Sequence, residues 1–289
     1  MSSDYRTRPQ VKFKAFRDLE RRRVHASDTV WAVLVASKLA SKTLTDAPAH
    51  RSLLADRYPN LPHVARMNQR LDRAAQLMES AETALCTMAF NLAFGLHEDF
   101  LRECLNLLVV EGKATRAEAA ENASKLHENL QQRSGHAFDA DALALFHLTR
   151  KIRNAQTHAA GLVRNSLVDH YRSLAGAQRA LWERLTGEPF RVPEVGDSAG
   201  LGVGGLIAGL AIQKRLAYDV NLALQGSIER STWADIATRE YLVESGKSPR
   251  DPTALRSLRG YLRGGFGALE LTDEELTNAL DRSKKSGTL

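Results

Sequence analysis

The spacing of apolar residues constrains the fold of this chain more than any other feature of its sequence. Between His63 and Val110 apolar residues recur every three or four positions, and the segment holds no proline and one glycine, Gly95. That spacing puts apolar side chains on one face of an α-helix, while the alternation typical of a strand is absent from the sequence. The pattern predicts an all-α protein whose longest helical segment is kinked or broken near Gly95.

The first 62 residues are expected to form an N-terminal helical arm. Apolar residues keep a helical spacing from Val11 to Val24, and Ser27 is a candidate N-cap for a second helix with the sequence WAVLVASKLASKTL. Pro48 marks the end of that helix, and Pro59 and Pro62 mark a further turn. The arm is therefore expected to hold two helices before the long segment begins.

Residues 63–187 are expected to form a central helical bundle. Thr115 and Glu118 have the spacing of a capping box, in which each side chain bonds the backbone N–H of the other residue at the start of a helix. The helices expected after the long segment run from this box to about Gly135, from Asp139 or Asp141 to just before Gly161, and from Leu162 to Leu185.

The composition changes after residue 187, where the sequence TGEPFRVPEVGDSAGLGVGG is rich in Gly and Pro. We place a domain boundary here and expect a linker followed by a smaller helical region over residues 188–289. The glycines of Gly200–Gly205 follow no strand and lack the lysine of a phosphate-binding loop, so they indicate a flexible linker or a close contact between helices. Capping boxes are expected to open two helices of this region, at Thr232–Asp235 and at Thr272–Glu275.

Composition is that of a soluble globular protein, with 43% hydrophobic and 26% charged residues. No apolar run reaches the roughly 18 residues of a membrane span, and the N-terminus MSSDYRTRPQ has no secretory signal. Cys86 and Cys104 are 18 residues apart, so one continuous helix would hold them too far apart to bond. We expect a cytoplasmic protein with two buried thiols, no membrane contact and, since no Cys/His spacing for zinc occurs, no metal or cofactor.

Basic residues outnumber acidic ones, and the formal net charge is +6. A basic balance favours an anionic partner such as nucleic acid, although each basic cluster taken alone is equally typical of a solvated helix face. Arg256, Arg259 and Arg263 share one helix face that would suit phosphates, a protein partner or solvent. The two larger clusters lie at residues 6–23 and around residues 150–172, the latter with Arg150, Lys151, Arg153, Arg164 and Arg172.

The most informative stretch is RNAQTHAAG, residues 153–161, at the end of the helix that begins at Asp139 or Asp141. Apolar residues of this helix form a core face, and polar residues form a stripe beside it. Arg153 and His158 lie about 140° apart on an ideal helix. They meet on one ligand only if the helix loosens at its end or a second chain completes the site. The core face comprises Leu145, Leu148, Ile152 and Ala155, and the stripe comprises His147, Lys151, Asn154 and His158.

These residue types suit the cleavage of RNA. Arginine donates bidentate hydrogen bonds to phosphate oxygens, histidine exchanges a proton near neutral pH, and asparagine orients either group by hydrogen bonding. RNA carries its own nucleophile, the 2′-hydroxyl, so a nuclease needs a base, an acid and charge stabilisation, with no metal ion. The chain also lacks the carboxylate cluster typical of two-metal nucleases. The alternative is an ordinary polar helix end, where His158 complements the helix dipole.

Arg153-Asn154, followed by His158 late in a helix of an all-α chain, resembles the signature of the HEPN superfamily. The resemblance covers about residues 64–186 and implies a short up-and-down helical bundle that pairs as a homodimer. In that family two facing motifs form a composite, metal-independent ribonuclease site. Many such proteins are toxins or phage-defence effectors that cut tRNA, mRNA or other cellular RNA.

The resemblance also implies roles for single residues. His158 would take or give the proton, Arg153 would stabilise the phosphate, and Asn154 would orient both. Members often carry a polar or acidic residue on an earlier helix that supports the motif, and by order along the chain Glu98 or Asp99 is the candidate. Further supporting or RNA-binding candidates are Lys151, Arg150 and Arg164.

The sequence therefore predicts a homodimeric endoribonuclease that binds RNA and that a protein partner regulates. The alternative is a non-catalytic helical protein that binds nucleic acid or serves as a scaffold, such as a regulator or an antitoxin-like partner. A HEPN-type bundle that binds RNA or protein without cutting lies between the two.

Overall fold

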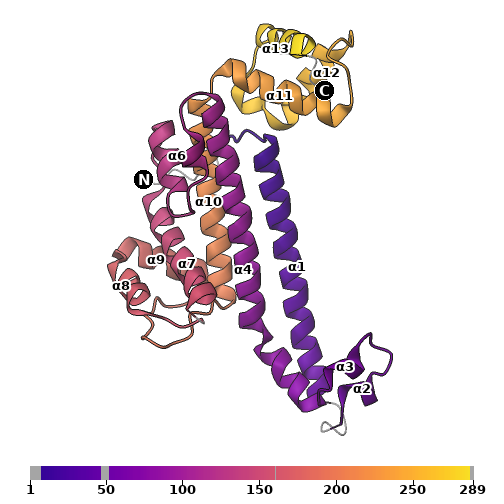
Figure 1. Ribbon diagram of the computed structural model, residues 1–289, viewed down its shortest axis with the longest axis vertical. Helices are drawn as coiled ribbons and strands as arrows, with labels where there is room; N and C mark the ends of the chain where they lie inside the picture. The colour runs from indigo at the N-terminus through magenta and orange to yellow at the C-terminus, as the bar shows by residue number, and fades with distance from the viewer. Residues whose placement is uncertain (1–7, 47–51, 160, 287–289) are drawn as a thin grey trace. The chain divides into compact units, whose positions relative to one another are not determined.

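The computed structural model describes residues 8–46, 52–159 and 161–286, and it confirms the all-α prediction (Figure 1). Outside helices, the ladder contacts of the described residues are two isolated β-bridges, Leu53 with Arg70 and Leu162 with Ser198. Among the described residues, no helix combines the length and apolar character that crossing a membrane requires. The helices are α1 Lys14–Thr45, α2 Leu54–Arg57, α3 Val64–Met67, α4 Leu71–Val110, α5 Arg116–Ala119, α6 Leu126–Ser134, α7 Ala140–His158, α8 Asn165–Ser173, α9 Gly176–Thr186, α10 Val203–Ser227, α11 Arg230–Ser245, α12 Ala254–Gly265, the 3-10 turn η2 Gly267–Leu269 and α13 Asp273–Ser286.

The chain divides into two compact units, each built from segments distant in the sequence. Unit 1 comprises residues 1–22, 94–143 and 212–289, and unit 2 comprises residues 23–93 and 144–211. Helices α1, α4, α7 and α10 contribute residues to both units. The boundaries expected after residues 62 and 187 do not coincide with those of the units, because a consecutive division cannot represent segments that return to the same core.

Unit 1 has an aromatic core that joins the beginning of the chain to its end. Phe13 lies 5.6 Å from Trp233 and 6.4 Å from Phe100 between ring centroids. The core is closed by the segment before α1, where the Val11 N–H donates to Asn221 Oδ1 (3.1 Å) and Asn221 Nδ2 donates to the Val11 carbonyl (2.7 Å). The N-terminal residues that the sequence assigns to an arm are thus part of a core in this unit.

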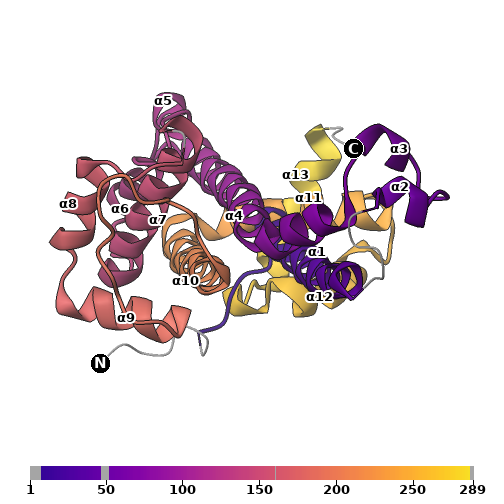
Figure 2. The ribbon, with the colours of Figure 1, turned by 90° about the horizontal axis from the view of Figure 1, so that it is seen from below.

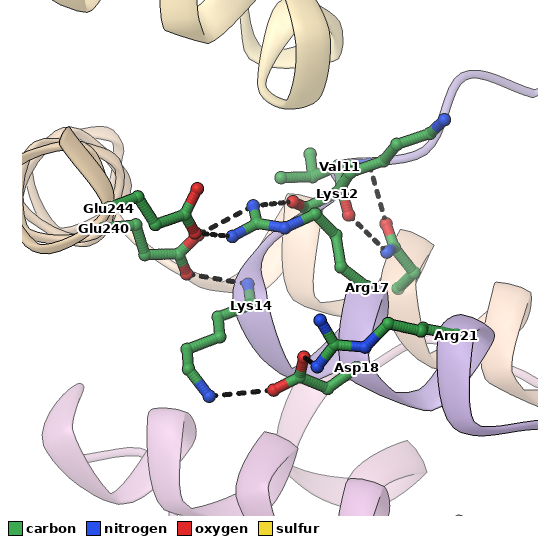
Figure 3. A network of polar contacts seen from close by, with 9 residues as sticks. Val11, Lys12, Lys14, Arg17, Asp18, Arg21, Glu240 and Glu244 are labelled. Atoms are coloured by element: carbon green, nitrogen blue, oxygen red, sulfur yellow. Dashed lines mark hydrogen bonds and ion pairs between the residues drawn. The ribbon is translucent and has the colours of Figure 1, made fainter.

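An ion-pair network covers the same junction (Figure 3). The Arg17 guanidinium donates to Glu240 at 2.9 Å and also pairs with Glu244, both on α11. The Glu240 carboxylate accepts from the Lys14 backbone N–H at 2.7 Å. Burial raises the pKa of Glu240, while the bond from the Lys14 N–H and the charge of Arg17 oppose that rise. The network fixes the first turn of α1 against α11.

Unit 2 contains the later part of α1 and the earlier part of α4, which pack along a seam of small and apolar residues. Leu44 joins Leu71, Ala74 and Ala75 in a buried cluster, and Ser41 Oγ donates to the Ala75 carbonyl at 3.2 Å. The first part of α10 lies beside α4 in both views (Figures 1 and 2). A Cβ on Gly209 would lie 2.4 Å from the Phe90 ring, so the glycine allows this approach.

The glycine-rich segment before α10 is a close contact between helices, the second of the two interpretations of the sequence. A Cβ on Gly204 would lie 2.8 Å from the Thr186 carbonyl oxygen at the end of α9, and one on Gly200 would lie 2.6 Å from the Thr83 side chain. Glycine is required at such positions because any larger side chain would displace backbone or a packed neighbour.

Several helix boundaries agree with the sequence. The capping boxes at Thr115–Glu118 and Thr272–Glu275 form with both reciprocal bonds, because each is complete within four residues. Cys86 and Cys104 both lie on α4 as free, fully buried thiols, as predicted.

Other boundaries were predicted wrongly. Helix α1 runs through Ser27, because no glycine or proline interrupts it there, and α4 runs through Gly95 without a break. Helix α11 begins at Arg230 with Glu229 as N-cap, so Thr232–Asp235 is not a capping box at its start. Two segments expected as single helices are each two helices, α5 with α6 and α8 with α9. The second split falls at extended residues Leu174 and Ala175.

Candidate functional site

Helix α7 carries the motif and starts at an aspartate cap, as the sequence predicts. Asp139 Oδ1 accepts from the Ala142 N–H at 2.8 Å, and its carbonyl accepts from the Leu143 N–H at 2.9 Å. Arg215 forms an ion pair with the Asp139 carboxylate. The predicted core face is confirmed for Leu145, Leu148 and Ile152, which are buried, whereas Ala155 is half-buried.

The helix stays regular through the motif. The Ala159 N–H donates to the Ala155 carbonyl at 3.0 Å, and Thr157 Oγ1 donates to the Arg153 carbonyl at 2.8 Å. The helix ends at His158, and Gly161 has a φ of 75° while its N–H donates to the Ala155 carbonyl at 3.1 Å. This left-handed closing turn is why the predicted end before Gly161 is correct.

The chain that follows the motif is anchored by the Gly- and Pro-rich segment. The Val163 N–H donates to the Asp197 carbonyl at 2.9 Å, and the Ala199 N–H donates to the Gly161 carbonyl at 2.8 Å. Gln156 Nε2 donates to the Ala199 carbonyl at 3.0 Å and so ties α7 itself to this segment. The segment expected as a linker therefore fixes the end of the motif helix within unit 2.

The predicted site residues on α7 differ in exposure. Arg153 and Asn154 are half-buried and His158 is exposed. Lys151 and Arg150 are half-buried one turn earlier, and the Nε atoms of Arg150 and Arg153 are fully buried. A partly buried arginine stem restricts its side-chain conformations, so few positions are open to the guanidinium.

Arg153 and His158 leave α7 in different directions. On a regular helix five residues separate the two by about 140° and about 7.5 Å along the axis. Of the two ways in which they were expected to meet, loosening of the helix end is excluded by the regular geometry of α7. The backbone of α7 alone therefore does not bring the two side chains together.

The remaining predicted positions lie elsewhere. Arg164 is exposed in the turn before α8, next to the end of the motif helix along the chain. Glu98 is half-buried and Asp99 exposed on the part of α4 that belongs to unit 1, whereas the motif belongs to unit 2. Asp99 lies 4.0 Å from Arg102 of its own helix. The supporting role of Glu98 or Asp99 stays a prediction from the family resemblance.

One histidine next to the basic part of α7 was missed at the level of sequence. His170 of α8 is half-buried, and burial lowers its pKa, with the positive charges of Lys151 and Arg150 acting in the same direction. No local pattern links His170 to residues 19 and 20 positions earlier, so only the packing of α8 reveals this neighbour.

Among the described residues, no group of three or more His, Cys, Asp or Glu side chains is arranged to hold a metal ion. Comparison with known proteins does not place this chain in a family. No family model, curated protein or solved structure matches the chain. Function must therefore be inferred from the site itself.

Proposed function

We propose that this protein is a metal-independent endoribonuclease whose site is completed by a second copy of the chain. The proposed residues are Arg153, Asn154 and His158, and the proposed substrate is cellular RNA in the cytoplasm. The observation that carries the proposal is the regular end of α7, which presents an exposed histidine and a half-buried arginine on different sides of one helix. Two such helices facing one another across a two-fold axis would bring the arginine of one chain to the histidine of the other.

The electrostatic surroundings support an anionic substrate. Lys151, Arg150 and Arg164 lie on or directly after the motif helix. Their charges would hold a phosphate backbone in place but would not select a sequence, since phosphate contacts position and base contacts specify. The target RNA would then be chosen by its shape or by unpaired bases.

The chemistry follows from these side chains. In the proposed reaction one His158 removes the proton of the 2′-hydroxyl, and the 2′-oxygen attacks the adjacent phosphorus. The bond from phosphorus to the 5′-oxygen breaks, and His158 of the second copy protonates that oxygen. Arg153 stabilises the charge on the phosphorane-like transition state, and Asn154 orients the reacting groups. The products are a 2′,3′-cyclic phosphate and a 5′-hydroxyl end. The family resemblance points to a toxin or phage-defence effector as the biological setting.

The experiment is cleavage of a mixed tRNA and mRNA pool by the purified protein in EDTA. Wild type is compared with Arg153→Ala and His158→Ala, and with the exposed residues Arg116→Ala and His25→Ala as matched controls. We expect 2′,3′-cyclic phosphate ends from wild type and both controls and none from the two motif variants. Cleavage that survives either motif substitution contradicts the proposal.

A non-catalytic function is the second candidate, and the same geometry allows it: on a regular helix Arg153 and His158 leave α7 about 140° apart within one chain. A helical protein that binds nucleic acid or acts as a scaffold, as a regulator or antitoxin-like partner, needs no convergence of these groups. RNA binding without cleavage by wild type in the same assay supports this candidate.

A further inference from the structure

Helix α1 contacts the rest of unit 2 through a narrow seam. From Leu34 to Leu44 its buried residues follow a spacing of three and four, and Lys38 Nζ lies 3.3 Å from Glu82 Oε2 of α4 at the edge of the seam. Such a seam covers about two positions in seven, as in a two-stranded coiled coil. The rest of α1 in this unit is exposed or half-buried. The buried positions are Ala26, Leu34, Ser37, Ser41 and Leu44.

A second apolar row runs along the exposed side of α1. Val24, Val35 and Leu39 are 51%, 59% and 62% exposed, and Trp31 is half-buried between them. These residues lie on average about 140° around the helix from the centre of the seam. We name the row formed by Val24, Asp28, Trp31, Val35, Leu39 and Lys42 the outer row. A helix with apolar residues on two faces is normally covered on both.

Between Asp28 and Lys42 the outer row is complementary to itself in the antiparallel direction. Trp31 and Leu39 lie four residues before and after Val35, and Asp28 and Lys42 lie seven residues before and after it. When two copies of α1 cross antiparallel with Val35 at a two-fold axis, Trp31 therefore faces Leu39 of the second copy and Asp28 faces Lys42. Asp28 and Lys42 are exposed, and neither pairs with another residue in the part of the chain that the structure describes.

We propose that the outer row of α1 binds the outer row of a second copy of this chain, antiparallel and centred on Val35. The charge pattern indicates that the binding partner is a second copy of α1. Asp28 and Lys42 lie at equal distances from Val35, so opposite charges meet only when the two helices are antiparallel and in this register. The row spans about 27 Å, which corresponds to a small interface, so association depends on protein concentration. The inference does not rest on the proposed ribonuclease function, since the motif lies on α7.

The first test is disulfide trapping in the full-length protein. Cys86 and Cys104 are fully buried and free, so an introduced surface cysteine is the reactive one. Val35→Cys meets its own copy at the two-fold axis and should form an intermolecular disulfide within minutes under mild oxidation. Val33→Cys is the matched control, because Val33 is also exposed (41%) but lies about 160° around the helix from Val35. Equal trapping at both positions, or faster trapping at residue 33, overturns the proposal.

The second test measures mass in solution by light scattering at several concentrations. Val35→Glu places two carboxylates at the axis and should halve the mass of the wild-type particle, whereas Val33→Glu should leave it unchanged. Asp28→Lys and Lys42→Asp should each weaken association at least tenfold, and the double exchange should restore it. A wild-type mass equal to the 31.9 kDa chain, or a double exchange that restores nothing, overturns the proposal. The proposed ribonuclease also needs a second copy, so a monomeric wild type would count against both proposals. A particle larger than one chain whose mass Val35→Glu leaves unchanged counts against this interface alone.

Discussion

Acid should destabilise this protein through a pair of buried histidines in unit 1. His97 and His127 are both fully buried, and their Nε2 atoms lie 3.1 Å apart. One nitrogen must donate and the other accept, so at least one of the two rings has to be neutral. Burial disfavours the charged ring and lowers the pKa of His97 from 6.5 to about 3. A proton on His97 would place a positive charge in a fully buried site.

The sign and size of the effect follow from linkage between protonation and folding. The folded pKa is below the unfolded one, so as pH falls the unfolded chain binds the proton first. The stability contributed by neutral His97 is present above about pH 6.5 and is lost progressively as pH falls toward 3. Between pH 7 and pH 5 the loss should be about 2 kcal/mol in the free energy of unfolding, since each pH unit below 6.5 costs about 1.4 kcal/mol.

The assay is urea unfolding followed by circular dichroism at pH 7 and pH 5. The double variant His97→Leu/His127→Leu removes both rings together, because replacing one alone would leave the other buried without its bond. Between pH 7 and pH 5 the free energy of unfolding of wild type should fall further than that of the double variant, by at least about 1.5 kcal/mol. His25→Leu, at an exposed position, is the control and should retain the wild-type pH dependence. Identical pH dependence for wild type and the double variant would refute the reasoning.

Three further predictions concern packing and are measured by the same unfolding assay at pH 7. Gly95→Ala should stabilise the protein by about 0.5–1 kcal/mol, because Gly95 lies inside α4 and an added Cβ meets nothing within 4 Å. Gly209→Ala should instead destabilise it by about 1–3 kcal/mol, since the Cβ would lie 2.4 Å from the Phe90 ring; the same sign for both glycines would contradict this difference in packing. Asn221→Leu removes the partner of both backbone polar groups of buried Val11 and should cost about 1–3 kcal/mol for each group left without a hydrogen bond. The same variant should be cleaved faster by trypsin after Lys12. Unchanged stability and cleavage would show that the position of Val11 does not depend on Asn221.

Helices were predictable from the sequence where their signals are local. The spacing of apolar residues, the capping boxes at Thr115 and Thr272, and the glycine turn after α7 each lie within a few residues. Continuity through Ser27 and Gly95 was missed because a candidate cap residue and a single glycine are weak signals that do not by themselves end a helix. Division into units was not predictable in the same way, since it depends on which distant segments share a core.

The candidate site shows the same division between local and distant information. The sequence places Arg153, Asn154 and His158 on one helix end and sets their angular separation. The anchoring of that end by residues 196–199 and the position of His170 beside the basic part of α7 depend on packing between remote segments. The same holds for the His97–His127 pair, whose members are 30 residues apart.

In the proposed enzyme, Arg153 and His158 act together only across two chains, and complementation is the most direct measurement of this. Arg153→Ala and His158→Ala chains, each silent alone, are co-expressed with different tags, and the mixed particle is purified through both. Each mixed particle retains one arginine and one histidine on opposite chains. We expect it to form 2′,3′-cyclic phosphate ends in EDTA, at a fraction of the wild-type rate because water must replace the missing second histidine. A mixed particle that is as silent as its parents, while wild type cuts, would contradict the shared site.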